Sequence, residues 1–74
     1  MEEIFDSLIA LQKKKVRQCA EALVPGVTDD DLLQPNDFAV LENSPHFRYN
    51  EGVLEGLMSA RMAYLARVRA LEEQ

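Results

Sequence analysis

The stretch PGVTDDDLLQPNDFAVLENSP, residues 25–45, divides this 74-residue chain, because it contains all three prolines and begins with a Pro-Gly pair. A Pro-Gly pair is a strong helix stop signal, so the segments on its two sides are predicted to be separate helices. The first helix is predicted over residues 2–24, where acidic residues come first and basic residues follow, as the helix dipole favours. The second is predicted over residues 45–72, with Ser44 as its N-cap and a proline in its first turn.

The connection between the two helices, residues 25–44, is too long to be an irregular loop in a compact domain, since loops beyond about 12–15 residues are uncommon. Thr28, followed by three aspartates, is a suitable N-cap for one short helical turn, and Asn36 for a second. Several apolar residues in and just after the connection either close this end of the hairpin or form a surface that binds a partner. They include Leu32, Leu33, Phe38, Phe47 and Tyr49.

The two predicted helices each carry a stripe of apolar residues at helical spacing, with a single polar residue near its middle. These polar residues are Gln12 and Arg61. If the helices pack antiparallel with these two residues level, the flanking charges are mostly opposite in sign, and Arg17 lies level with Glu55. We therefore predict this register, because opposite charges can select one even where they add little stability. The alternative is that both polar heads reach water at the edge of the helix pair.

A row of small residues follows the second predicted helix at spacings of 4, 3, 4, 3 and 4, on the side away from its apolar stripe. Small residues let helix backbones approach closely, so this small-residue row is predicted to be a self-association surface. The alternative is that alanine is only a good helix former on an exposed face, although two glycines inside one helix cost about 1 kcal/mol each against alanine. The row consists of Gly52, Gly56, Ser59, Ala63, Ala66 and Ala70.

The size of the chain also favours self-association. A chain of this length buries only about 60% of its unfolded surface, so a domain this small needs a disulfide, a metal, an oligomer or unusually good helix packing. Cys19 is the only cysteine and His46 the only histidine, which excludes an intramolecular disulfide and a zinc site built from several Cys or His. We predict a single all-α domain over residues 1–74, an antiparallel helical hairpin that dimerises into a four-helix bundle.

The charge of the chain argues against nucleic acid as a partner. Thirteen acidic and eight basic residues give a net charge of −5, which repels a polyanion. The longest uncharged stretch is far shorter than the roughly 20 apolar residues that span a bilayer. Glu2, Glu3 and Asp6 contradict the basic start of a signal peptide. We therefore expect a soluble cytoplasmic protein that binds neither nucleic acid nor membrane.

No arrangement of residues in the sequence predicts catalysis or a cofactor. Ser44 lies beside His46, but the serine has a capping role and no third catalytic group accompanies the pair. We therefore expect a non-enzymatic interaction or adaptor module that binds itself and another protein, with no catalytic, cofactor or metal site.

Two other classes of function stay open at this point. A helical regulator that touches nucleic acid would need the basic block, residues 13–17, to be exposed and contiguous with Arg61, Arg67 or Arg69 across a dimer. A small metal-binding or catalytic protein would need His46 and several acidic residues of the connection to converge on one place. Those acidic residues are Asp29, Asp31, Asp37 and Glu42.

Overall fold

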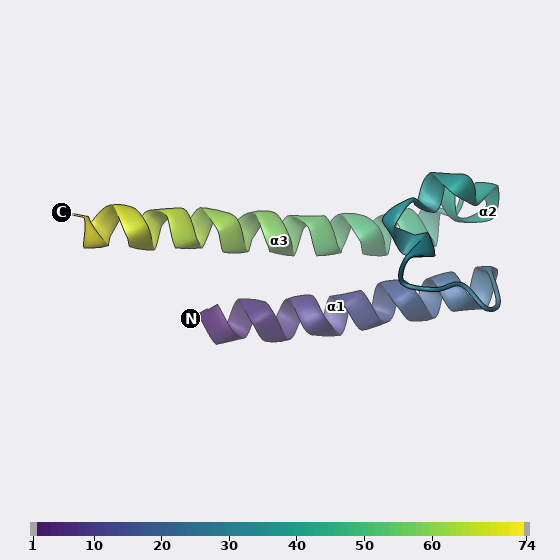
Figure 1. Ribbon diagram of the computed structural model, residues 1–74, viewed down its shortest axis with the longest axis horizontal. Helices are drawn as coiled ribbons and strands as arrows, with labels where there is room; N and C mark the ends of the chain where they lie inside the picture. The colour runs from purple at the N-terminus through teal and green to yellow at the C-terminus, as the bar shows by residue number, and fades with distance from the viewer. Residues whose placement is uncertain (1, 74) are drawn as a thin grey trace.

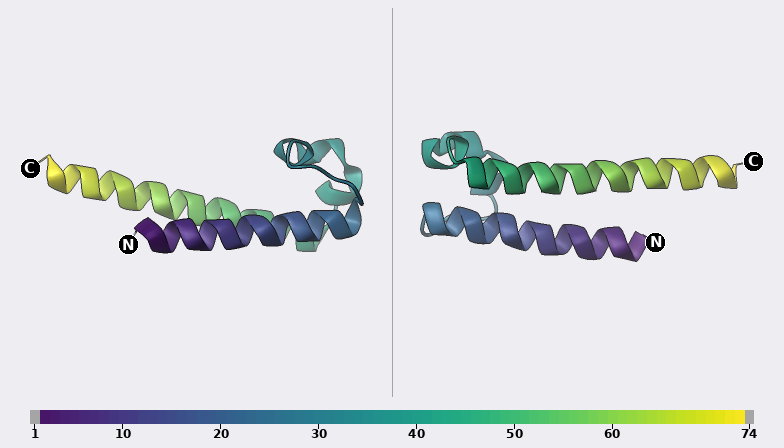
Figure 2. Two further views of the ribbon diagram at one scale, coloured as in Figure 1. Left: turned by 60° about the horizontal axis from the view of Figure 1, so that its bottom comes forward. Right: turned by 180° about the vertical axis from the view of Figure 1, so that it is seen from behind.

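The computed structural model describes residues 2–73, which form an antiparallel helical hairpin (Figure 1). Two long helices, α1 (Glu2–Leu23) and α3 (Pro45–Glu72), run side by side in opposite directions (Figure 2). The prediction of an all-α hairpin with short helical turns in its connection is therefore confirmed, whereas the four-helix bundle involves a second chain and stays a prediction. The turns are η1 (Asp31–Leu33), η2 (Pro35–Asp37) and the short α2 (Ala39–Glu42).

The two long helices end and begin where local backbone chemistry requires it. After α1, the chain turns at Gly26, whose φ of +83° lies in the left-handed region that side chains with a Cβ rarely adopt. At the start of α3, the hydroxyl of Ser44 accepts a hydrogen bond from the backbone N–H of Phe47 at 3.2 Å, and Pro45 occupies the first turn. The predicted cap of the second helix is therefore confirmed.

The connection is ordered by its own hydrogen bonds. The N–H of Asp31 donates to the hydroxyl of Thr28 at 3.2 Å, and the carboxylate of Asp31 accepts from the N–H of Thr28 at 3.0 Å. This reciprocal pair has the form of a capping box between Thr28 and Asp31, whereas the N-cap position of η1 itself is occupied by Asp30. The predicted capping role of Asn36 is wrong, because Pro35 opens the turn one residue earlier and places Asn36 inside it.

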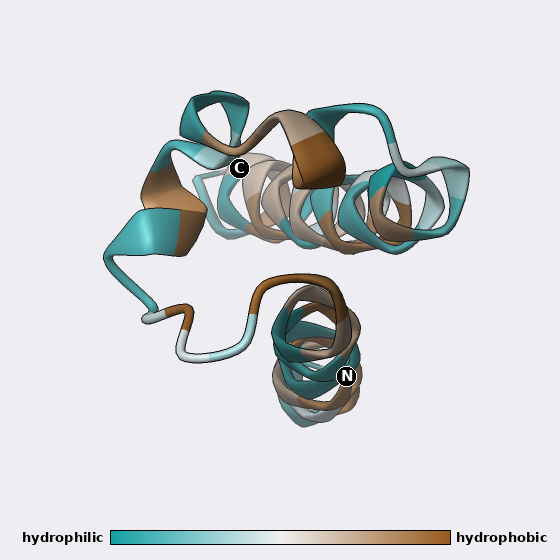
Figure 3. Cartoon of the chain, turned by 90° about the vertical axis from the view of Figure 1, so that its right-hand side faces the viewer, coloured by the Kyte–Doolittle hydropathy of each residue, from teal (hydrophilic) through white to brown (hydrophobic). Residues whose placement is uncertain are grey.

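A small apolar core lies at the connection end of the hairpin. In the end-on view of Figure 3, the connection leaves α1, passes along one side of the helix pair and then crosses the outer side of α3. Leu41 and Phe47 are the largest fully buried side chains, and Cys19 is among the half-buried residues packed against them. Burial raises the pKa of the Cys19 thiol, so this residue behaves as a small apolar side chain rather than as a thiolate. The core cluster consists of Val16, Ala20, Val27, Leu41 and Phe47.

The register of the two long helices differs from the predicted one. Gln12 is only 7% exposed, and its amide nitrogen donates to the backbone oxygen of Asn50 at 2.9 Å and to its side-chain oxygen at 3.2 Å. Arg61 instead donates to Asp6 at 2.9 Å and to Glu2 at 2.8 Å. Pairing Gln12 with Arg61 is therefore wrong, because eleven residues of helix, about 16 Å, separate Asn50 from Arg61.

The physical reason for the error is that a buried amide is a stronger constraint than exposed charges. Gln12 must reach an acceptor nearby, whereas ion pairs at the surface contribute only about 0–1 kcal/mol and can form in several registers. The predicted level of Arg17 with Glu55 is wrong for a related reason. The connection folds back over α1 and supplies Asp29, which accepts from Arg17 at 3.0 Å, while Glu21 accepts from the same guanidinium at 3.0 Å.

The free end of the hairpin, away from the connection, contains fewer buried side chains than the connection end. Besides the ion pairs of Arg61, the rings of Phe5 and Tyr64 lie with their centroids 5.6 Å apart. Here α3 extends past the start of α1 (Figure 1), and Leu71 in its last turns is exposed. The predicted apolar stripe of α3 is therefore only half-buried, because one chain supplies a single neighbouring helix to cover it.

Truncation of a core leucine tests the position of the core. We expect Leu41→Ala to lower the free energy of unfolding by about 2–5 kcal/mol, because it leaves a cavity among the fully buried side chains. Leu33→Ala is the matched control, and since Leu33 is 79% exposed it should change stability by less than about 0.5 kcal/mol. Urea unfolding followed by circular dichroism measures both. Equal losses for the two variants would contradict this core.

A double-mutant cycle tests the register. Gln12→Leu should cost about 1–3 kcal/mol, because the backbone and side-chain oxygens of Asn50 lose their donor. Combined with Asn50→Ala, it should show a coupling energy of about 0.5–3 kcal/mol, whereas Gln12→Leu with Arg61→Ala should be additive within about 0.5 kcal/mol. Chemical unfolding of the six proteins gives both values. Coupling with Arg61 and additivity with Asn50 would restore the predicted register.

Candidate functional site

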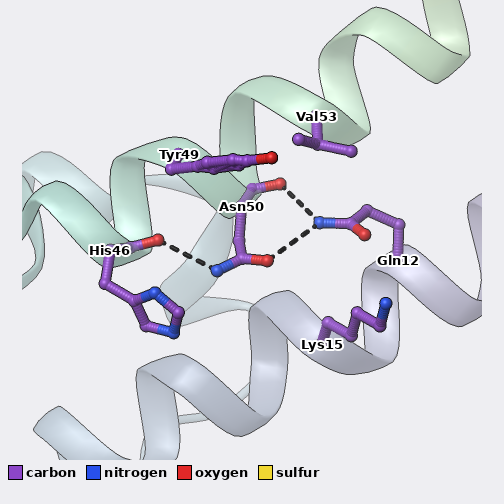
Figure 4. A pocket seen from close by; sticks show the side chains of 6 residues that line it. All are labelled: Gln12, Lys15, His46, Tyr49, Asn50 and Val53. Carbon is purple, nitrogen blue, oxygen red and sulfur yellow. Dashed lines mark hydrogen bonds between the residues drawn. The ribbon is translucent and has the colours of Figure 1, made fainter.

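A shallow depression lies between α1 and α3 next to the Gln12–Asn50 contact (Figure 4). Its amide groups are already engaged with each other, because Asn50 accepts from Gln12 and donates to the backbone oxygen of His46 at 3.0 Å. Apolar and cationic side chains complete the lining. The depression is lined by Gln12, Lys15, His46, Tyr49, Asn50 and Val53.

The depression belongs to a longer apolar surface that crosses both helices. On α1, Leu11, Leu8 and Ile4 precede Lys15 at spacings of 4, 3 and 4, and they therefore share its side of the helix. On α3, Tyr49 and Val53 line the same depression, and the four-residue spacing continues to Leu57. Five of these large apolar residues are exposed, and we call this set the side face. It consists of Ile4, Leu8, Leu11, Tyr49 and Val53.

The side face lies on the opposite side of the hairpin from the connection. The connection is tied to the other side of α1, where Arg17 binds Asp29 and Val24 packs against the core. Lys15 and Val53, in contrast, border the open depression on the side face. One side of the helix pair is therefore covered by the chain itself near the core, and the side face is not.

The charges of the chain are distributed unevenly around the hairpin. The rows that form the side face, from Ile4 through Leu8 and Leu11 to Lys15 on α1 and from Tyr49 through Val53 to Leu57 on α3, contain none of the 13 acidic residues. Lys15 is the charged residue in these rows. A net charge of −5 is thus carried by the other surfaces of the molecule, which leaves the side face apolar and weakly basic.

The small-residue row predicted as a self-association surface lies on the outer face of α3. All six of its residues are exposed. A Cβ added at Gly52 or Gly56 would meet no atom within 4 Å, so no close approach within this chain explains either glycine. The described part of the chain leaves this surface uncovered, so its role in self-association stays a prediction.

The apolar residues predicted as a partner surface are divided by the fold. Phe47 is 1% exposed and belongs to the core, so its assignment to a partner surface is wrong. Leu32 and Phe38 are half-buried against the same core. Leu33 and Tyr49 are exposed, but only Tyr49 joins other exposed apolar residues, on the side face. Sequence reasoning missed Ile4, Leu8 and Leu11 as surface residues, and their spacing of 4 and 3 was the available signal.

In the part of the chain that the structure describes, His46 and the acidic residues of the connection are not gathered into one metal-binding cluster. Within residues 2–73, no group of three or more His, Cys, Asp or Glu side chains is close enough together to hold a metal ion. Lys13, Lys14 and Lys15 are exposed, but Arg17 at the end of the basic block is paired with acidic side chains, as is Arg61. In this same part of the chain, no helix has both the length and the apolar character needed to cross a membrane.

Comparison with known proteins adds no relative. No protein-family model, curated protein or solved structure matches the chain.

A salt titration tests the basic block. We expect binding to DNA or RNA to be weaker than a Kd of about 10⁻⁴ M at physiological salt, because acidic neighbours neutralise Arg17 and the rest of the surface repels phosphates. Fluorescence anisotropy with a labelled oligonucleotide measures this affinity. A sub-micromolar Kd that weakens steeply with added salt would instead support the nucleic-acid regulator.

Proposed function

We propose that the chain is a small, non-enzymatic protein–protein interaction module that acts as a homodimer. The observation that carries this proposal is the balance of apolar side chains. Among the described residues, eleven large hydrophobic side chains are exposed, whereas six hydrophobic residues form the buried core. Where such side chains gather, as on the side face, the exposed apolar surface is typical of sites where proteins bind one another.

The shape of the molecule also supports a docking function. The helices form a rod with extents of 50 × 20 × 19 Å, which offers long helical faces and little enclosed volume. Helical faces bind partners through apolar side chains at spacings of three and four residues, the spacing found on the side face. An enclosed, mostly apolar pocket is the usual setting for small-molecule chemistry, and the depressions between α1 and α3 are open.

The proposal places the module in the cytoplasm, where thiols stay reduced. Cys19 is half-buried and burial raises the pKa of its thiol, which suits a residue that packs rather than one that forms disulfides. The partners in this proposal are a second copy and another protein, with no nucleic acid, membrane or cofactor.

Affinity capture of the untagged protein from its own cytosol tests this function. We expect a second copy or another protein to be recovered with it in near-stoichiometric amount, and to remain bound in about 0.5 M salt, since salt screens ionic contacts but does not weaken apolar ones. The same capture at low salt is the control. Recovery of the chain alone and as a monomer under both conditions would contradict an interaction module.

A further inference from the structure

The chain exposes more surface than a compact monomer of its mass. Its accessible surface is 5451 Å², whereas the scaling of surface with mass gives about 4,600 Å² for a compact monomer of this mass. The excess of about 800 Å² is close to the roughly 800 Å² that each partner contributes to a standard protein–protein interface. The rod shape of the hairpin therefore exposes additional area about equal to one partner's share of a standard interface.

The side face is where this excess can be buried. It combines apolar rows from two helices in one surface, and all five of its residues are exposed. The small-residue row on the outer face of α3 is the other uncovered surface, but glycine, alanine and serine side chains offer little apolar area for burial. An interface of standard size is thus more readily built on the side face.

The chemistry of the side face suits a second copy of the same chain. Two molecules of net charge −5 repel each other through their acidic surfaces, but the side face carries no acidic residue. In a twofold interface the same patch lies on both partners, so it must be self-complementary, and the five apolar residues of the side face meet this condition. Lys15 is exposed at the border of the depression, where its ammonium group reaches water. Two antiparallel helices laid on two others give the four-helix arrangement found in many small proteins.

A second copy would also supply the missing source of stability. Small domains usually rely on a disulfide, a metal or an oligomer. Cys19 is a free cysteine, and residues 2–73 contain no group of side chains that could hold a metal ion. Of these three means of stabilising a thin core, association is the one for which the described residues provide a surface.

We infer that the side face, formed by Ile4, Leu8, Leu11, Tyr49 and Val53, is the surface on which a second copy of this chain packs, giving a twofold four-helix bundle. This inference rests on the proposed function and names the partner of its apolar surface. The Gln12–Asn50 hydrogen bonds lie at the edge of the same depression, so the second copy shields them from water.

Matched glutamate substitutions on three sides of the hairpin test the inference. Leu11→Glu is the side-face variant, and because Leu11 is 53% exposed, the hairpin itself tolerates the change. Met62→Glu is the first control, since Met62 is 70% exposed and lies nine residues after Val53, which is half a turn away around α3. Ala63→Glu is the second control and probes the small-residue row. Sedimentation equilibrium gives the mass of each protein, and thermal unfolding at several concentrations gives its Tm.

We expect the wild-type protein to be a dimer whose Tm rises with concentration, because association stabilises only the folded state. Leu11→Glu should weaken the dimer on the order of 100-fold and yield a monomer with a concentration-independent Tm, whereas both controls should keep the wild-type mass. Tyr49→Glu, on the other helix of the side face, should reproduce this loss even if the Leu11 variant fails to fold.

Two results would overturn the inference. A wild-type protein that is monomeric at every concentration excludes a second copy as the occupant, and capture from the cytosol then decides separately whether another protein binds. A dimer that is dissociated by Ala63→Glu but not by Leu11→Glu or Tyr49→Glu assigns the interface to the small-residue row. In that second case, the proposed interaction module stands and the side face does not.

Discussion

The buried amide of Gln12 is the constraint on which the arrangement of the hairpin depends. Its two hydrogen bonds to Asn50 join two helices whose apolar faces could otherwise slide along each other. A shift by one helical turn, about 5.4 Å, would leave this amide without acceptors in a buried position, which costs about 1–3 kcal/mol. The same shift would separate Arg61 from Asp6 and Phe5 from Tyr64, so the contacts of the free end follow from this single polar pair.

Stability is distributed unevenly along the hairpin. At the connection end, segments from α1, the connection and α3 enclose Leu41 and Phe47 from all sides. At the free end, half-exposed ion pairs and one ring contact hold two helices together, and pairs of this kind contribute about 0–1 kcal/mol each. Local opening is therefore expected to begin at the free end, where the fewest apolar groups leave water.

The hairpin was predictable from sequence because each of its boundaries has a local cause. Ser44 caps the helix that follows it, Thr28 and Asp31 bond reciprocally, and the Pro-Gly pair ends α1, all through hydrogen bonds and backbone angles set within a few residues. The register was not predictable from opposite charges, because these pair with whichever partner lies nearest. The role of Asn50 as the acceptor for Gln12 could not be predicted, because these two residues are 38 positions apart in the sequence. The side face could not be predicted for the same kind of reason, since Leu11 and Val53 form one surface only after both helices are oriented.

The position of the free end also determines how the hairpin responds to mechanical load. The first turn of α1 and the last turns of α3 lie at this end (Figure 1), so tension applied through them pulls the two helices apart in the manner of a zipper. Each contact then bears the force in turn, first the pairs of Arg61, then the Gln12 amide, and last the core around Phe47. A rod loaded in this way yields at low force through successive small steps, whereas tension on one end of α1 and the opposite end of α3 would load every contact at once.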